Sequence, residues 1–206
     1  MCYLLINCMK RKLYYILIVA VLLFGCKHQI RAKLQSGNIK IDTGIAQSPV
    51  YKMLDKQRDF RTIFHRGADT LRFKTSNVSY RTNRYRSIDD TAYARLNNCG
   101  SYLINETLKI NIGISSGFVA DGFTINCHNR LFTILPYHET DAITVGEEEK
   151  PVTFQVINQS LTLSKYNYQI NDSVYGKINF KIIETNNGQK IHHIGYGYFR
   201  AKVDKR

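Results

Sequence analysis

The sequence predicts an all-β domain, a mainly antiparallel β-sandwich, and three observations favour this fold class. Apolar and polar residues alternate over many short stretches, which is the spacing of side chains on the two faces of a strand. Polar turn signals separate these stretches. The composition is that of a globular protein, with 44% hydrophobic and 22% charged residues in 206, and no repeat indicates a propeller or solenoid. A partly open β-barrel is the second choice.

The expected strands follow residue 51, and the clearest spans residues 108–114, where every second residue is apolar. In chain order, we expect strands at 60–64, 71–74, 78–85, 108–114, 123–127, 131–135, 152–157, 161–163, 177–182 and 195–203. Asn129-Arg130 and Asn186-Asn187-Gly188 are among the turns between them. One short helix after Asp89 or Asp90 is expected as a crossover. Tyr196 and Tyr198 share one face of the last strand, either exposed or packed near a sheet edge.

The chain is expected to divide into three parts. Residues 1–25 form a leader, residues 26–50 a flexible tether, and residues 51–206 a single β-rich domain. The tether is inferred because residues 27–49 are polar, contain glycines and show no sustained hydrophobic period.

The leader has the ordered features of a secretory signal peptide. A basic stretch at residues 10–12 precedes residues 13–24, which carry no charge and are almost all apolar, and Gly25-Cys26 ends the run. A spanning helix needs about 20 apolar residues, so this run is short for one. Translation can start at Met1 or at Met9, because residues 1–8 precede the basic stretch.

The segment Leu23-Phe24-Gly25-Cys26 resembles the lipobox of bacterial lipoproteins. The resemblance implies that Cys26 receives a diacylglyceryl group and becomes the first mature residue, so that the protein is lipid-anchored in the bacterial cell envelope. Lys27, with no acidic residue beside it, is compatible with the outer membrane; the resemblance leaves the periplasmic and surface sides open. The alternatives are an N-terminal anchor without lipidation and a leader that is cut elsewhere.

Positive charge is concentrated in the first half of the chain. Residues 27–98 contain 15 basic and 6 acidic side chains, whereas residues 99–206 contain 11 and 10. Such a field favours an anionic envelope glycan, lipid headgroups or an acidic protein as partner. Export argues against nucleic acid, and no nucleic-acid partner is expected.

Basic and aromatic residues are interleaved at residues 80–86. Arg81, Arg84, Tyr85 and Arg86 form a candidate patch for an anionic ligand, because guanidinium groups bind carboxylate or phosphate and Tyr rings offer stacking faces. The alternative is an exposed strand whose charges prevent edge-to-edge pairing.

Two cysteines remain in the expected domain, Cys99 and Cys127. An oxidising compartment would allow them to form a disulfide, and buried free thiols are the alternative. No metal site and no cofactor are expected, since His128, His138 and the His192-His193 pair lack the usual zinc-ligand spacing.

One catalytic pattern occurs, because residues 113–117 fit G-x-S-x-G with Ser115 as nucleophile. Asp141 or Asp172, followed by His192 or His193, would complete the triad order of an exported hydrolase. That nucleophile requires a strand, a sharp turn and a helix, whereas the following residues predict another strand. The sequence therefore favours a non-catalytic binding or structural domain, leaves enzyme activity open and keeps the hydrolase as the alternative.

The C-terminal part contains a tight turn entering a strand at residues 168–180 and a closing strand at residues 195–199. This arrangement resembles the last strands of Ig-like sandwich domains found in exported bacterial proteins. The resemblance implies an Ig-like or jelly-roll type of sandwich, and it implies no activity.

Overall fold

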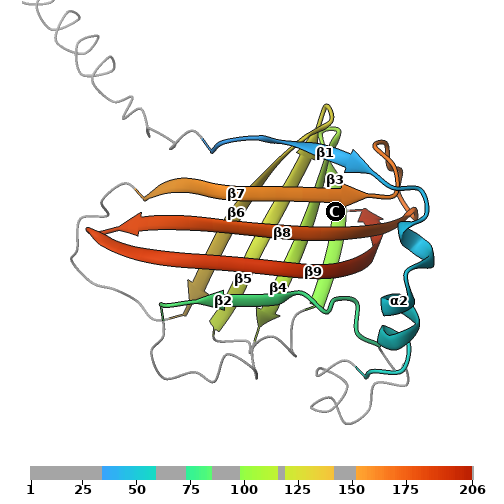
Figure 1. Ribbon diagram of the computed structural model, residues 1–206, viewed down its shortest axis with the longest axis horizontal. Coiled ribbons are helices and arrows are strands. Elements are labelled where there is room, and N and C mark those ends of the chain that lie inside the picture. Colours follow the sequence, from blue (N-terminus) through green and yellow to red (C-terminus); the bar gives the residue numbers. More distant parts are fainter. Residues whose placement is uncertain (1–33, 59–72, 85–97, 116–118, 142–151, 206) are drawn as a thin grey trace, which may run out of the picture. The chain divides into compact units, whose positions relative to one another are not determined.

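The computed structural model describes residues 34–58, 73–84, 98–115, 119–141 and 152–205, all within the compact unit Ala32–Arg206 (Figure 1). The strands in chain order are β1 (Gly37–Ile41), β2 (Ser79–Thr82), β3 (Asn98–Ile104), β4 (Thr107–Ser115), β5 (Val119–His128), β6 (Leu131–Thr140), β7 (Thr153–Leu163), β8 (Ser173–Asn186) and β9 (Gln189–Lys205). A 3-10 turn η1 (Ile45–Gln47) and a short helix α2 (Pro49–Leu54) follow β1.

The nine strands form one mixed sheet in the order β2-β9-β3-β4-β5-β6-β1-β7-β8, with β8 also paired to β9. Among the described strands, only the pairs β1–β7 and β3–β9 run parallel. The predicted all-β, mainly antiparallel fold is therefore confirmed.

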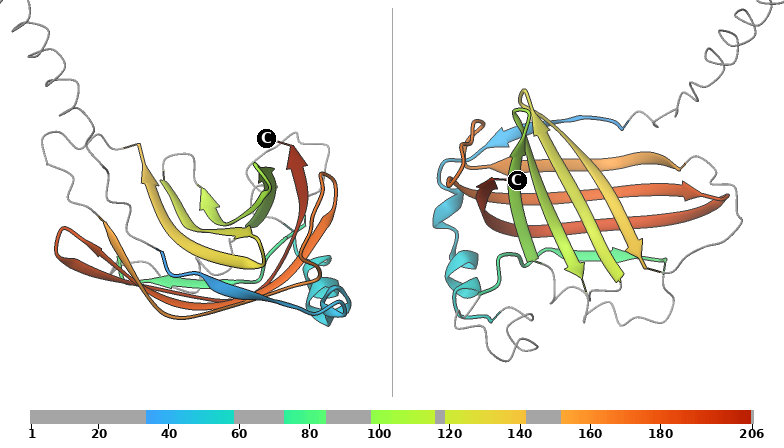
Figure 2. Two further views of the ribbon diagram at one scale, coloured as in Figure 1. Left: turned by 90° about the horizontal axis from the view of Figure 1, so that it is seen from above. Right: turned by 180° about the vertical axis from the view of Figure 1, so that it is seen from behind.

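The sheet folds into two facing layers that cross each other (Figures 1 and 2). One layer contains β3, β4, β5 and β6, and the other contains β7, β8, β9 and β2. Two strands join the layers. β1 pairs first with β6 and then with β7. β9 pairs with β8 along most of its length, with β2 over residues 193–196 and with β3 at its end.

A single hydrophobic core fills the space between the layers, because each strand turns its alternate apolar residues inward. Phe123 of β5 and Phe180 of β8 meet edge to face across this core, with ring centroids 4.7 Å apart. Both side chains are fully buried. Contacts of this kind join the two layers.

Two-residue turns connect three of the hairpins. Asn105-Glu106, Asn129-Arg130 and Asn187-Gly188 all have positive φ at both positions, as expected for the type I′ turns that suit the twist of a hairpin. The Asn129-Arg130 and Asn186-Asn187-Gly188 turn predictions are therefore confirmed.

The folded domain begins earlier than predicted. β1 lies within residues 26–50, which we expected to form a tether, and it pairs with both β6 and β7. After it, α2 packs on the domain through the buried side chains of Tyr51 and Leu54. The Tyr51 hydroxyl lies 3.2 Å from the carbonyl oxygens of both Gly176 and Phe199. The expected boundary at residue 51 is therefore wrong, since residues 37–50 contribute to the sheet and to its packing.

Several predicted segments coincide with strands. The stretches at 108–114, 123–127 and 131–135 lie in β4, β5 and β6, and those at 177–182 and 195–203 lie in β8 and β9. The stretches at 152–157 and 161–163 belong to one strand, β7, which has an irregular register at Val156/Asn158. The stretches at 60–64 and 71–72, and the helix expected after Asp89 or Asp90, lie outside the described residues.

Candidate anion-binding face

The outward side of the layer β1-β7-β8-β9-β2 carries side chains in three rows, set by the strand register. Residues paired across neighbouring strands lie about 4.8 Å apart, and residues two apart on a strand about 7 Å. We call the following residues the basic face: first row Lys40, Thr162, Lys177 and Tyr198; middle row Ser160, Asn179, Tyr196 and Ser79; third row Asn158, Lys181, Ile194 and Arg81.

The alternation of each strand explains why these side chains point outward. Their chain neighbours, such as Ile178 and Phe180 in β8 and Tyr80 in β2, are buried in the core. Adjacent strand residues point to opposite faces, so Lys177, Asn179 and Lys181 face solvent.

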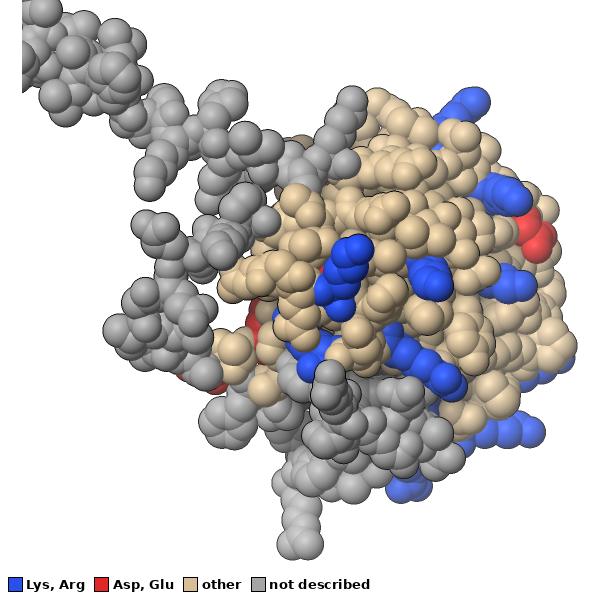
Figure 3. Space-filling view, turned by 60° about the vertical axis from the view of Figure 1, so that its left-hand side comes forward, with Lys and Arg blue, Asp and Glu red and all other residues tan. Residues whose placement is uncertain are grey.

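The basic face carries four cations and no acidic side chain. Two cations lie in the first row and two in the third, while the middle row is neutral. Lys177 Nζ lies 5.2 Å from the ring centroid of Tyr198. On the side of the molecule shown in Figure 3, several basic side chains are spread over the described residues, while acidic ones are few. A surface of this kind attracts anions over several ångströms.

Only part of the patch predicted at Arg81, Arg84, Tyr85 and Arg86 lies on this face. Arg81 is exposed on this face. Because β2 ends the strand order, Arg81 also lies at a sheet edge, which agrees with the alternative that its charge prevents edge-to-edge pairing. Arg84 instead places Nη2 at 2.8 and 2.9 Å from the two carboxylate oxygens of Glu184. The charge of Arg84 is therefore already paired inside the protein, and we do not count Arg84 in the basic face. Tyr85 and Arg86 lie outside the described residues.

The partner of Arg84 belongs to a buried polar network between β2, β8 and β9. The Tyr80 hydroxyl lies 2.7 Å from His193 Nδ1, and His193 Nε2 lies 2.9 Å from Glu184 Oε2. Burial tends to raise the pKa of the Glu184 carboxyl. The hydrogen bonds and the charges of His193 and Arg84 more than offset this effect, so the pKa of Glu184 lies below its usual value. Burial raises the pKa of the Tyr80 hydroxyl. The network thus keeps a carboxylate ionised inside the core and holds β2 against β8 and β9.

A second buried carboxylate, Asp121 of β5, lies 3.1 Å through Oδ1 from His138 Nδ1 on β6. Burial raises the pKa of Asp121, and the neighbouring His138 opposes this rise. Its Oδ2 is buried without a hydrogen-bond partner among the described residues. Neither histidine–carboxylate pair belongs to a cluster of three metal-ligating side chains, since the described chain contains none.

The described part of the predicted catalytic pattern, residues 113–115, is the end of strand β4. β4 ends at Ser115, whose backbone pairs with Ala120 of β5, so the next element is an antiparallel strand. The candidate partners have other contacts. His193 is bound to Tyr80 and Glu184, and Asp172 forms an ion pair of 2.7 Å with Lys165. Hydrogen bonds from Lys165 and from the backbone of Gln169 lower the pKa of Asp172.

Cys99 and Cys127 are buried free thiols. Cys99 lies on β3 and Cys127 on β5, with β4 between them. Two strand spacings amount to about 10 Å, whereas a disulfide requires Cα atoms within about 7 Å. Of the two alternatives left open by the sequence, the structure therefore has buried free thiols and not the disulfide. Burial raises the pKa of both thiols, that of Cys127 to about 12, so both remain protonated at neutral pH.

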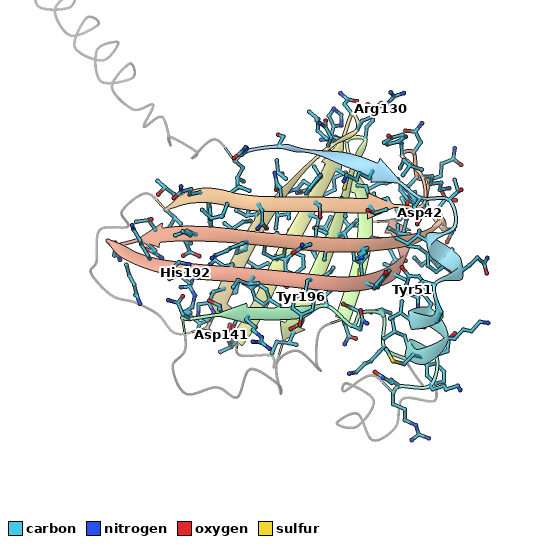
Figure 4. The ribbon with its side chains drawn as sticks, viewed as in Figure 1. Asp42, Tyr51, Arg130, Asp141, His192 and Tyr196 are labelled. Atoms are coloured by element: carbon cyan, nitrogen blue, oxygen red, sulfur yellow. The ribbon has the colours of Figure 1, made fainter. Side chains whose placement is uncertain are left out.

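A pocket of about 560 Å³ opens beside the Asn105-Glu106 and Asn129-Arg130 turns. Its lining combines apolar strand residues with polar turn and loop residues: Ile39, Leu103, Glu106, Leu108, Cys127, His128, Asn129, Arg130, Tyr166, Asn167 and Tyr168. The Arg130 guanidinium lies 5.2 Å from the Tyr166 ring centroid, at the turn labelled in Figure 4. Such a pocket suits a small molecule with apolar and polar parts.

Sequence reasoning missed Lys40, Lys177 and Lys181 as binding residues. The period-two pattern of residues 177–182 already places Lys177 and Lys181 on a polar strand face. What the pattern does not contain is the strand order, which brings Lys40 from β1 into the same row.

Comparison of the chain with protein-family models, with curated proteins and with solved structures finds no match in any of the three. Within the described part of the chain, no helix is both long enough and apolar enough to cross a membrane.

Proposed function

We propose that this protein is a lipoprotein of the bacterial cell envelope, anchored by acylated Cys26, whose β-domain is a non-catalytic module that binds anionic envelope material. The basic face is the observation that supports anion binding by the domain. The leader, which ends in Leu23-Phe24-Gly25-Cys26, supports a lipid anchor at Cys26. Two or more acyl chains anchor a protein stably to a membrane. Lys27 favours the outer membrane as the location.

The cations of the basic face suit a binding role because they are available. Lys40, Lys177, Lys181 and Arg81 form no ion pair with another described residue. They come from three different strands of one layer, β1, β8 and β2, whose backbone fixes the spacing of their Cα atoms. An anionic ligand would therefore meet several positive charges on one surface.

Simultaneous replacement of Lys40, Lys177, Lys181 and Arg81 by glutamine is expected to weaken binding of the full-length protein to dextran sulfate at least about fourfold. Four exposed ion pairs contribute about 0.2–1 kcal/mol each, and about 1.4 kcal/mol corresponds to tenfold. Binding is measured in detergent at two salt concentrations, and the variant should also show a weaker salt dependence. As a matched control, Lys52, Lys56, Lys109 and Lys205 are replaced by glutamine. Equal losses in both variants would show that net charge alone drives binding and would exclude the basic face.

The anchor is tested by mass spectrometry of the N-terminal peptide of protein purified from bacterial membranes. We expect a peptide that begins at acylated Cys26 and that is lost when Cys26 is replaced by serine. A peptide that still contains residues 13–25, unmodified, would identify a retained anchor without lipidation and contradict this part of the proposal.

A further inference from the structure

We infer that the ligand of the basic face is an anionic polysaccharide whose chain runs across the strands along the middle row, Ser160, Asn179, Tyr196 and Ser79. This inference rests on the proposed binding function of the face and names the class of ligand. Three features of the rows favour such a ligand: the placement of their charges, their uncharged polar groups and an exposed aromatic ring.

The charges flank the middle row on both sides. Lys177 of the first row and Lys181 of the third lie two residues on either side of Asn179 in β8, about 7 Å away along the strand. Lys40 extends the first row, and Arg81 ends the third beside Ile194. A chain along the middle row could therefore direct anionic groups to either side and meet a cation on each.

The middle row itself offers uncharged groups that bind sugar hydroxyls. Asn179 provides an amide that both donates and accepts hydrogen bonds, and Ser160 and Ser79 provide hydroxyls with the same property. All three lie on the outward side of their strands. Their spacing of about 4.8 Å across the strands is comparable with the length of one sugar ring, so successive residues can contact successive rings.

Tyr196 supplies a flat apolar surface in this row. Its side chain is 52% exposed. It lies between Asn179 of β8 and Ser79 of β2, on the strand next to the edge strand β2, where Figure 4 labels it. The face of a sugar ring carries C–H groups that pack on an aromatic ring. An aromatic side chain of this kind gives recognition beyond simple charge attraction.

The same face fits a bilayer surface less well. Membrane-binding surfaces combine basic residues with large apolar side chains that enter the acyl region, whereas the only aliphatic side chain in the three rows is Ile194. A polysaccharide uses the hydroxyl and amide groups between the cations, and these groups have no function against acyl chains. The observations therefore favour a glycan over anionic lipid headgroups.

The test compares three anionic probes with the full-length protein in detergent: polygalacturonate, poly-L-glutamate of similar length, and mixed micelles containing phosphatidylglycerol. Polygalacturonate and polyglutamate both carry carboxylates, but only the former has sugar rings. We expect tighter binding to polygalacturonate than to either other probe. Replacing Tyr196 by alanine is expected to weaken polygalacturonate binding about tenfold and to leave polyglutamate binding unchanged.

Two further variants complete the design. Tyr196→Phe keeps the ring and should keep polygalacturonate binding, whereas Tyr166→Ala removes a similarly exposed tyrosine, 42% exposed, that lines the pocket and belongs to none of the three rows, and should change nothing. Melting temperatures verify that each variant folds. Equal binding of polygalacturonate and polyglutamate, stronger binding to phosphatidylglycerol, or an unaffected Tyr196→Ala variant would each overturn the glycan inference. The proposed function fails separately, if the lysine and arginine variant of the basic face binds all probes as tightly as wild type.

Discussion

Replacing Glu184 by alanine is expected to lower the free energy of unfolding by about 3–5 kcal/mol, because it removes one partner of a buried ion pair. Glu184 accepts hydrogen bonds from Arg84 at 2.8 and 2.9 Å and lies 2.9 Å from His193. Without the carboxylate, the guanidinium of Arg84 would remain partly buried without its counter-charge. His193 would lose the contact that fixes its ring. Urea unfolding followed by circular dichroism measures the change.

Glu139→Ala is the matched control for this variant, since it removes an exposed carboxylate from β6 and should change stability by no more than about 0.5 kcal/mol. A loss below about 1 kcal/mol for Glu184→Ala would mean that Arg84 and His193 find water or new partners, and that the network does not hold β2 in place.

The same carboxylate predicts a pH dependence. The pKa of Glu184 is held below its usual value of 4.5 in the folded protein. The unfolded chain therefore binds a proton more readily, and the stabilisation is present above about pH 4.5 and is lost as the pH falls through the folded pKa. Glu184→Gln should lack this component, so its stability should fall less than that of wild type on acidification.

Replacing Phe180 by alanine is expected to cost about 3–5 kcal/mol, the range for a buried phenylalanine. Its ring is fully buried and lies 4.7 Å from that of Phe123 across the two layers. It also packs closely on Gly195 of β9, where an added Cβ would collide with the ring. The alanine variant therefore leaves a cavity bordered by both layers, which the sheet cannot close without moving one layer.

The control for Phe180→Ala is Tyr196→Ala, which removes an aromatic ring from the neighbouring strand but from its exposed side. Thermal unfolding of both variants should show a large shift for Phe180→Ala and almost none for Tyr196→Ala. Similar shifts for the two would contradict the assignment of inward and outward faces on which the basic face depends.

Strands with a clear period of two could be predicted from the sequence. Residues 108–114 and 195–203 alternate cleanly and lie in β4 and β9. β1 was missed because it is only five residues long and begins with Gly37-Asn38, residues that are typical of loops. Its pairing with β6 and β7 involves residues far along the chain, and such partners leave no trace in the local pattern.

The candidate site was predicted only in part, for a related reason. Arg81 could be identified because basic and aromatic residues are adjacent in the sequence there. Arg84 has the same sequence context, yet its partner, Glu184, is 100 residues away. The rows of the basic face likewise combine strands from both ends of the chain, so that Lys40 and Tyr198 share a row only because β7 and β8 lie between them.

The triple pairing of β9 has a consequence for how the chain folds. β9 follows the other described strands in the chain, and its partners β2, β3 and β8 begin at Ser79, Asn98 and Ser173. The pairs with β2 and β3 close loops of roughly a hundred residues, a contact pattern that slows folding. Neither layer can complete its hydrogen bonds until β9 is in place. The docking of the two layers should therefore be a late step of folding, whereas the hairpins of β4, β5 and β6 can form early from local contacts.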